Sequence, residues 1–115
     1  MPYLKLNTNT PITPEQSEKL LDELSKLLAT ETGKPERYVM VQLSGDHRML
    51  FSGTSQALAY LECKSIGLTK HQAQSLTETL CQTVSTRLEI EPERIYIEFS
   101  NCPAEFWGWN GSTFG

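Results

Sequence analysis

The sequence has no long apolar run, no basic cluster and only three cysteines. A membrane span needs about 20 consecutive apolar residues, and the opening segment MPYLKLNTNT lacks the features of a signal peptide. The formal net charge of -4 disfavours binding to nucleic acid or to an anionic membrane. Cys63, Cys81 and Cys102 are odd in number and widely spaced, which favours a reducing compartment. We therefore expect a cytoplasmic protein, whose release, if any, follows a route without a signal peptide.

Most signatures of enzyme chemistry are missing as well. His47 and His71 stand alone, with no Cys, Asp or Glu at the spacing of metal ligands. There is no C-x-x-C pair, no Ser-His-Asp set, no phosphate-binding loop and no dinucleotide fingerprint. We therefore expect neither a metal nor a cofactor.

What the sequence does contain is a repeat. The 115 residues fit one domain, and 38% hydrophobic residues with 21% charged residues predict a folded one. Pro-Glu-Arg triplets begin at Pro35 and Pro92, 57 residues apart. The domain, residues 1–115, therefore divides into two similar units, about 3–57 and 58–115.

Each unit reads as strand, helix, strand. Thr13 with Gln16, and Thr69 with Gln72, form capping-box patterns. An apolar period of one helix face follows each box: Leu20, Leu21, Leu24, Leu27 and Leu28 in the first unit, and Ala73, Leu76, Leu80, Val84 and Leu88 in the second. Gly33 should end the first helix. Strands are predicted at 4–7, 38–43, 58–64 and 95–99.

Two such units predict an α/β sandwich. Crossovers through helices make the two strands of each unit parallel, and the result is a four-stranded mixed sheet with both helices on one face. Along the predicted strands, every second side chain is apolar, and these side chains share one face of the sheet: Leu4, Leu6, Val39, Val41, Leu43, Leu61, Cys63, Ile95, Ile97 and Phe99. The other is mixed: Tyr3, Lys5, Asn7, Tyr38, Met40, Gln42, Tyr60, Glu62, Lys64, Tyr96 and Glu98. We expect an oligomer to cover the mixed face; a single solvated face is the alternative.

Pro2 is the one residue that could supply an unusual catalytic group. Met1 precedes a small residue and is expected to be removed, which leaves a secondary amine at the chain start. An α-amine titrates near pH 8, and burial lowers that pKa. A neutral amine could then take a proton from carbon beside a carbonyl. On position alone, a proline that merely begins a strand is the commoner situation.

Two further segments could form a site. The tail packs Trp107, Trp109 and Phe114 into a short stretch, which suggests either the wall of an aromatic pocket or a packing contact. Ser65 and Ile66 precede Gly67 where a strand should end and a helix begin, a common place for ligands.

These segments together resemble the macrophage migration inhibitory factor family of the tautomerase superfamily. The matching stretches are Met1-Pro2, Leu6-Asn7-Thr8-Asn9, Thr32-Gly33-Lys34-Pro35, Ser65-Ile66-Gly67, Arg94-Ile95-Tyr96-Ile97 and Gly108-Trp109-Asn110-Gly111-Ser112-Thr113-Phe114. The resemblance implies a homotrimer of doubled β-α-β subunits with active sites between subunits. It also implies cofactor-free keto–enol tautomerisation of arylpyruvates such as phenylpyruvate, or of dopachrome.

The resemblance also implies roles for single residues. Pro2 corresponds to the catalytic base, and Lys34 to the lysine that meets the substrate carboxylate. The remaining substrate-binding candidates are Tyr3, Ser65, Ile66, Tyr96 (from the neighbouring subunit), Glu98, Trp107, Trp109 and Phe114.

Three positions depart from the family pattern. Glu98 replaces an asparagine, and an ionised carboxylate there would repel an acidic substrate and raise the pKa of the Pro2 amine. Trp107 replaces a small aliphatic residue. Leu58 and Leu61 replace a C-x-x-C pair, so no thiol-oxidoreductase activity is expected.

The sequence leaves two other functions open. A signalling protein could bind a receptor through the trimer surface and keep the pocket as a relic. A regulatory domain of the same fold could bind a small effector without turnover.

Overall fold

Each half of the chain folds as a strand, a helix and a second strand. The computed structural model describes residues 1–115. Its elements are β1 (Tyr3–Thr8), α1 (Pro14–Thr32), the 3₁₀ turn η1 (Glu36–Tyr38), β2 (Met40–Ser44), β3 (Ala59–Ile66), α2 (Lys70–Leu88), η2 (Pro92–Arg94), β4 (Ile95–Cys102), η3 (Ala104–Phe106), β5 (Gly108–Trp109) and β6 (Ser112–Thr113).

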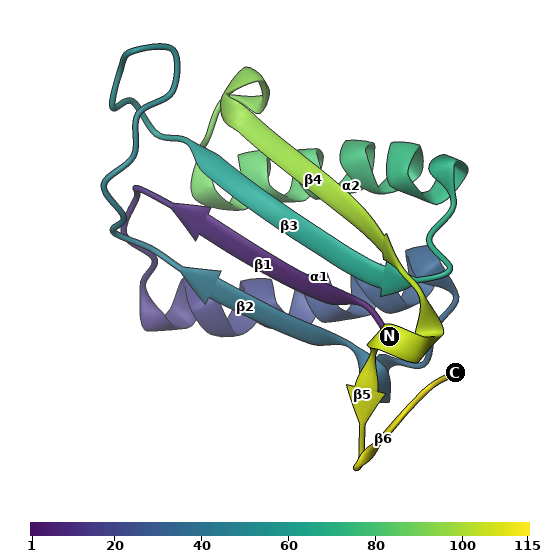
Figure 1. Cartoon of the computed structure of the whole chain (residues 1–115). Coiled ribbons are helices and arrows are strands. Elements are labelled where there is room, and N and C mark those ends of the chain that lie inside the picture. Colours follow the sequence, from purple (N-terminus) through teal and green to yellow (C-terminus); the bar gives the residue numbers. More distant parts are fainter.

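The four long strands form one mixed sheet in the order β2-β1-β3-β4. β1 pairs with β2 and β3 pairs with β4 in parallel, while β1 and β3 meet antiparallel at the centre. Both helices cover the same face of this sheet (Figure 1). The predicted fold class is therefore confirmed: two β-α-β units share one sheet and one helical layer.

Both helices begin at the predicted caps. The Thr13 and Thr69 side chains each accept a hydrogen bond from the N3 backbone N–H, and the N3 glutamine side chain accepts one from the backbone N–H of the cap residue. The α1 helix ends at Gly33 with φ of 69°, a left-handed conformation that glycine adopts without strain. The prediction for this end is confirmed.

The core lies between the sheet and the two helices. Four sheet side chains are fully buried in it, namely Leu4, Leu6, Leu61 and Cys63. The helices contribute Leu20, Leu24, Leu28, Leu76, Leu80, Val84 and Leu88. This set agrees with the predicted helix faces and with part of the predicted sheet face. The remaining predicted residues are only half-buried: Leu21, Leu27 and Ala73 on the helices, and Val39, Val41, Leu43, Ile97 and Phe99 on the sheet side.

Some boundaries differ from the prediction. β2 begins at Met40 rather than at residue 38, because Pro35 caps the turn η1 and Tyr38 belongs to that turn. β4 runs to Cys102, beyond the predicted end at 99. The tail forms a small hairpin of β5 and β6, whose turn residues Asn110 and Gly111 have φ of 51° and 85°.

The second sheet face carries no helix. The sheet has two ends, which differ in the segments beside them (Figure 1). At the Pro2 end, β1 begins beside the C-terminal tail; at the Tyr96 end, β4 begins beside the loop of residues 45–58. Neither helix is both long and apolar enough to cross a membrane.

Candidate active site

A cavity of about 480 Å³ opens where β1 begins. It lies at the Pro2 end and is bordered by the start of the chain, the η1–β2 connection, one residue of β3 and the tail. Its lining residues are Met1, Pro2, Tyr3, Arg37, Tyr38, Val39, Met40, Gln42, Lys64, Trp107, Gly108, Trp109 and Phe114. Three strands and the tail hairpin thus converge on the amino terminus.

Pro2 is held firmly at the base of this cavity. Its side chain is fully buried, and its carbonyl oxygen accepts a hydrogen bond from the Met40 backbone N–H at 3.0 Å. That bond continues the β1–β2 ladder to the first residue after Met1, so the position of the Pro2 nitrogen is fixed by the sheet.

The surroundings of the amino terminus disfavour positive charge. Burial and, to a lesser degree, the ammonium of Lys34 lower the pKa of the Met1 amine below its usual value of 8.0. Pro2 lies one residue deeper than Met1, which is only half-buried. We expect an amine at Pro2, freed by removal of Met1, to meet the same charge of Lys34 and the apolar surroundings of the Pro2 ring.

An aromatic cluster forms one wall. The Tyr38 ring meets Trp109 edge-on at 5.3 Å and Phe114 at 6.2 Å, and the Trp109 and Phe114 rings stack at 5.9 Å. The tail hairpin is tied to this wall because the Phe114 N–H donates to the Trp107 carbonyl at 3.1 Å. Such a wall suits a planar, aromatic ligand.

The charged lining of the cavity is entirely cationic. Arg37 and Lys64 line it and no carboxylate side chain does. The Arg37 guanidinium lies 4.8 Å from the Tyr38 ring centroid. A cavity with this lining attracts an anion such as a carboxylate.

The chain brings only some of the predicted site residues together. Pro2, Tyr3, Trp107, Trp109 and Phe114 line the cavity, and the charge of Lys34 acts on the adjacent amine.

Ser65 and Ile66 lie at the end of β3, outside the lining. The Ser65 side chain points into the helical layer, because it follows Cys63 by two residues on the same face, and its Oγ has no hydrogen-bond partner. A contact of Ser65 with a ligand would therefore have to use its backbone.

Tyr96 lies towards the opposite end of the sheet, and Glu98 lies in mid-strand, in the register row of Glu62, Lys5 and Gln42. The Tyr96 ring packs against Phe51 at 4.6 Å between centroids, and Glu98 accepts a hydrogen bond from the Tyr60 hydroxyl at 3.1 Å. A single chain does not place either residue beside Pro2.

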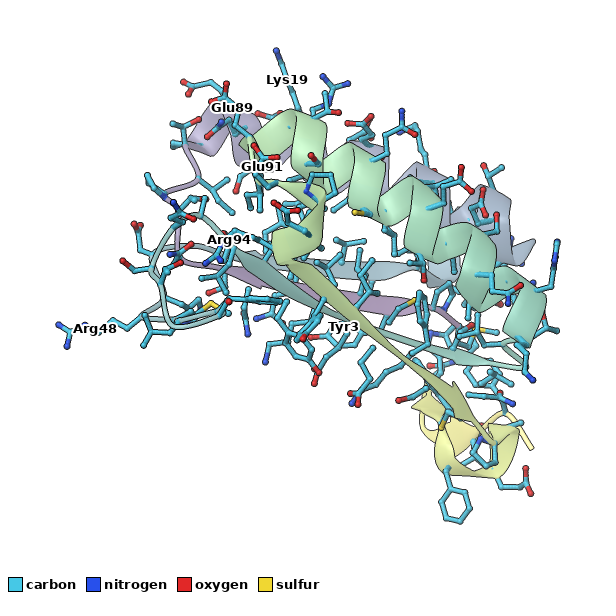
Figure 2. The ribbon with its side chains drawn as sticks, turned by 90° about the horizontal axis from the view of Figure 1, so that it is seen from above. Tyr3, Lys19, Arg48, Glu89, Glu91 and Arg94 are labelled. Atoms are coloured by element: carbon cyan, nitrogen blue, oxygen red, sulfur yellow. The ribbon has the colours of Figure 1, made fainter.

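Arg94 organises that opposite end. Its buried guanidinium donates to the carbonyls of Ala57, Phe51, Thr54 and Gln56 at 3.0, 3.1, 3.2 and 3.0 Å. Figure 2 shows Arg94 beside this loop and far from the tail. It thereby fixes the turn that places Phe51 against Tyr96.

Several lining residues were not predicted as site residues: Arg37, Tyr38, Val39, Met40, Gln42 and Lys64. The alternation of the mixed face already grouped Met40, Gln42 and Lys64 with Tyr3, so that signal could have found them. Tyr38 was misplaced because the prediction extended β2 through the turn η1.

Other reactive groups lie away from the cavity. Burial raises the pKa of the Cys63 thiol to about 12, so it stays protonated. No three His, Cys, Asp or Glu side chains are grouped so that they could hold a metal ion.

Comparisons with known proteins agree on one family. The family model described as macrophage migration inhibitory factor matches residues 1–115. The chain is 42% identical to macrophage migration inhibitory factor from Rattus norvegicus, over 99% of each chain, and 36% identical to the Brugia malayi homolog, over 100% of each. The solved structure of the Prochlorococcus marinus homologue is similar with a TM-score of 0.94 and 42% identity, covering 98% of this chain and 99% of that one. The Toxoplasma gondii structure has a TM-score of 0.92 and 30% identity, covering 97% and 99%.

Proposed function

The chain belongs to the macrophage migration inhibitory factor family, and on that premise we propose that it is a cofactor-free keto–enol tautomerase with Pro2 as its base. Removal of Met1 would free the secondary amine. The observation that carries the proposal is the setting of the amino terminus, where burial and Lys34 lower the pKa of the Met1 amine beside an aromatic, cationic cavity.

The proposed reaction is a proton shift within one substrate. The neutral Pro2 amine takes a proton from the carbon beside the carbonyl of an arylpyruvate, and the electron pair of that C–H bond moves to form the enolate. Return of the proton to the enolate oxygen gives the enol; return to carbon regenerates the keto form. The proton and the electrons stay within substrate and Pro2, so no external oxidant or reductant is needed.

The cavity and its surroundings offer groups for each part of such a substrate. Lys34, whose charge acts on the Met1 amine, is the proposed partner of the carboxylate. Trp107, Trp109 and Phe114, which line the cavity, are the proposed wall for the ring. The fixed Pro2 ring restricts the directions from which its nitrogen can attack, so little entropy is lost in aiming it. Tyr3, Ser65 and Ile66 complete the proposed substrate site, the last two through their backbone.

Proteins of this family generally oligomerise, and we propose that this chain forms a homotrimer. The bare, mixed sheet face supports the proposal, and so does the distance along the sheet between Tyr96 and Pro2 within one chain. In the trimer, Tyr96 and Glu98 of one subunit would complete the Pro2 cavity of the next. Light scattering should give about three times the chain mass of 13.0 kDa; a monomer at micromolar concentration would refute the trimer.

The first test is turnover of phenylpyruvate by a chain that begins at Pro2, as verified by intact mass. We expect Pro2→Gly to lower kcat/KM by about 10²- to 10⁴-fold. Pro11→Gly is the matched control, because Pro11 is exposed and lies in the loop before α1. Full activity in a chain that retains Met1 would overturn the proposal, because its proline nitrogen is an amide.

The same assay separates the other functions. Saturable binding of phenylpyruvate without turnover would favour a ligand-binding domain or a signalling protein over a tautomerase. A cytoplasmic location is a separate proposal, supported only by the cysteine usage of the sequence.

A further inference from the structure

The Pro2 cavity is cationic although the chain as a whole is acidic. The chain has ten Lys and Arg residues against fourteen Asp and Glu residues. Arg37 and Lys64 line the cavity, and the charge of Lys34 acts on the Met1 amine beside it. No carboxylate side chain lines the cavity. The site therefore carries a local charge opposite in sign to the net charge of -4.

These three cations have no partner within the chain. Both ion pairs of the chain belong to the helices, so Lys34, Arg37 and Lys64 are all unpaired. The Arg37 guanidinium lies 4.8 Å from the centroid of the Tyr38 ring, a contact with the ring face that neutralises no charge. The positive charge of the three side chains is thus available to a ligand.

Two carboxylates lie in the register row next to that of Lys64, namely Glu62 and Glu98. The Tyr60 hydroxyl is 3.4 Å from a Glu62 oxygen and 3.1 Å from a Glu98 oxygen. Lys5 is the register partner of Glu62 on β1. Neither carboxylate forms an ion pair with Lys64. The row of Lys64 itself contains no acidic residue, since its partners are uncharged.

The cations approach Pro2 from two sides of β1. Tyr3, the residue after Pro2, is the register partner of Lys64 on β3. The segment that contains Lys34 and Arg37 leads into β2, the other neighbour of β1 (Figure 1). Neighbouring strands are about 4.8 Å apart, so the β2 and β3 sides are about 10 Å apart. Two anionic groups held apart match this arrangement better than one carboxylate does.

A single carboxylate also leaves charge unbalanced. An arylpyruvate brings one carboxylate, for which Lys34 is the proposed partner. The proposed trimer would add the carboxylate of Glu98 from the next subunit. Three cations would still exceed these two anions by one.

From this surplus we propose that the site takes an aromatic 2-oxo acid with a second anionic group on its ring, and that Lys64 receives that group. The inference rests on the proposed function and narrows its substrate class to doubly anionic arylpyruvates. The ring would lie between the two anionic ends, against the aromatic wall of Trp109 and Phe114. Lys64 would determine specificity, because it contacts the substrate away from the reacting carbon.

The direct test compares two inert probes, 1,4-phenylenediacetate and its monomethyl ester. They share the ring and one acetate group, only the first carries two negative charges, and neither has a ketone to tautomerise. Trp107 and Trp109 are the two tryptophans of the chain and both line the cavity, so tryptophan fluorescence reports its occupation. With a chain that begins at Pro2, the diacetate should bind about five-fold more tightly, and 1 M salt should remove most of this preference.

Lys64→Gln should abolish the preference, because it removes the proposed partner of the second carboxylate and keeps a polar side chain. Lys5→Gln is the matched control, since Lys5 lies on the same sheet face outside the cavity lining, and it should leave the preference in place. Equal affinities for the two probes in the wild type would overturn the second anion site. So would a diacetate that leaves the fluorescence unchanged at millimolar concentration. A preference that survives in Lys64→Gln would overturn the role of Lys64.

Turnover separates this inference from the proposed function. The assay measures the ratio of kcat/KM for 4-carboxyphenylpyruvate to that for its ring methyl ester. The two substituents also differ electronically, so the deciding quantity is the change of this ratio on substitution. Lys64→Gln should lower it about five-fold and Lys5→Gln should not. Turnover with a ratio that Lys64→Gln leaves unchanged overturns this inference and leaves the tautomerase standing. Preferential binding of the diacetate without turnover of any arylpyruvate supports the second anion site and refutes the tautomerase.

Discussion

The two ends of the sheet are built to one plan but differ in what they can do. Tyr3 opens β1 at the Pro2 end and Tyr60 lies near the start of β3 at the Tyr96 end, 57 residues later in the chain. Each end is closed by a segment of the other half, the tail at one and the loop of residues 45–58 at the other (Figure 1). The Tyr96 end also has an apolar cavity, of about 310 Å³.

The difference arises from the chain terminus. β1 starts where the chain starts, so an amine can exist there after Met1 is removed; β3 starts in mid-chain, and its nitrogen atoms are amides. The arginines of the two Pro-Glu-Arg triplets also differ, in their exposure and in their hydrogen bonds. Arg94 is fully engaged by four carbonyls, whereas Arg37 stays exposed on the cavity. The repeated β-α-β unit supplies the framework at both ends, and the chain terminus confines the proposed chemistry to one of them.

The largest difference we expect between the two ends is in stability. Arg94→Met removes the donors of four loop carbonyls in a buried place, and we expect the free energy of unfolding to fall by about 3 kcal/mol. Arg37→Met removes an exposed cation and should change it by less than about 0.5 kcal/mol.

Urea titration of both variants at one protein concentration measures this contrast, since unfolding of an oligomer depends on concentration. Equal losses for Arg94→Met and Arg37→Met would show that the loop of residues 45–58 is held by packing rather than by the guanidinium.

The fold could be predicted because its signals are local and occur twice. Capping boxes at Thr13 and Thr69 and a helical period behind each box fix the helices. The alternation of apolar residues fixes the sheet face, and the repeat fixes the parallel pairing within each half. Only the antiparallel contact of β1 with β3 needed the structure, because the sequence does not say which strands of two repeats become neighbours.

The site could be predicted only in part, because its signals are not local. Arg94 holds the loop by donating to backbone carbonyls, and because every residue has a backbone carbonyl, the sequence cannot predict which ones are used. Ser65 follows Cys63 by two residues on one strand, so the alternation of side chains predicts that it faces the helices, as it does. The resemblance to the family instead led to its assignment as a substrate-binding residue. Whether Tyr96 and Glu98 belong to the cavity depends on a second chain, and that remains a prediction.

Lys34 places a cation near the amino terminus. Lys34→Ala should raise KM for phenylpyruvate by about ten-fold and change kcat little, because a carboxylate contact is made in the ground state and the transition state alike. An unchanged KM with a lower kcat would assign Lys34 a different role.

The same variant should move the pH profile. Lys34 contributes to the lowered pKa of the Met1 amine, and we expect the same effect on the Pro2 amine once Met1 is removed, so the neutral base should persist to lower pH while Lys34 is present. Without it the amine pKa rises, and kcat/KM should be lost at a higher pH as the solution is acidified. Lys5→Ala, a cation on the open sheet face, is the control and should leave the profile in place.

A smaller effect is expected from the Glu98 carboxylate, which shares a register row with Glu62 and Lys5. Glu98→Asn should raise kcat/KM for phenylpyruvate several-fold, about 1 kcal/mol, and lower the apparent pKa of the Pro2 amine. Superimposable pH profiles for the wild type and Glu98→Asn would mean that this carboxylate is electrostatically silent.

The smallest effect should come from the ends of the two helices, where the halves differ in one residue type. Gly33 follows α1 with φ of 69°, and Glu89 follows α2 with φ of 55°. Both are left-handed, but only glycine adopts this conformation without a Cβ penalty. The α2 end persists because the Glu89 and Ile90 N–H groups both donate to the Ser85 carbonyl, and because the Ile90 side chain is buried.

Glu89→Gly should therefore raise the free energy of unfolding by about 0.5–1 kcal/mol. Gly33→Ala should lower it by about 1 kcal/mol, and for backbone reasons alone, since a Cβ at Gly33 would meet no atom within 4 Å. Urea midpoints measured at one protein concentration test both variants, and unchanged phenylpyruvate turnover would show that the site is intact. A loss of stability in Glu89→Gly would mean that the Glu89 side chain stabilises this end by more than the strain of its backbone.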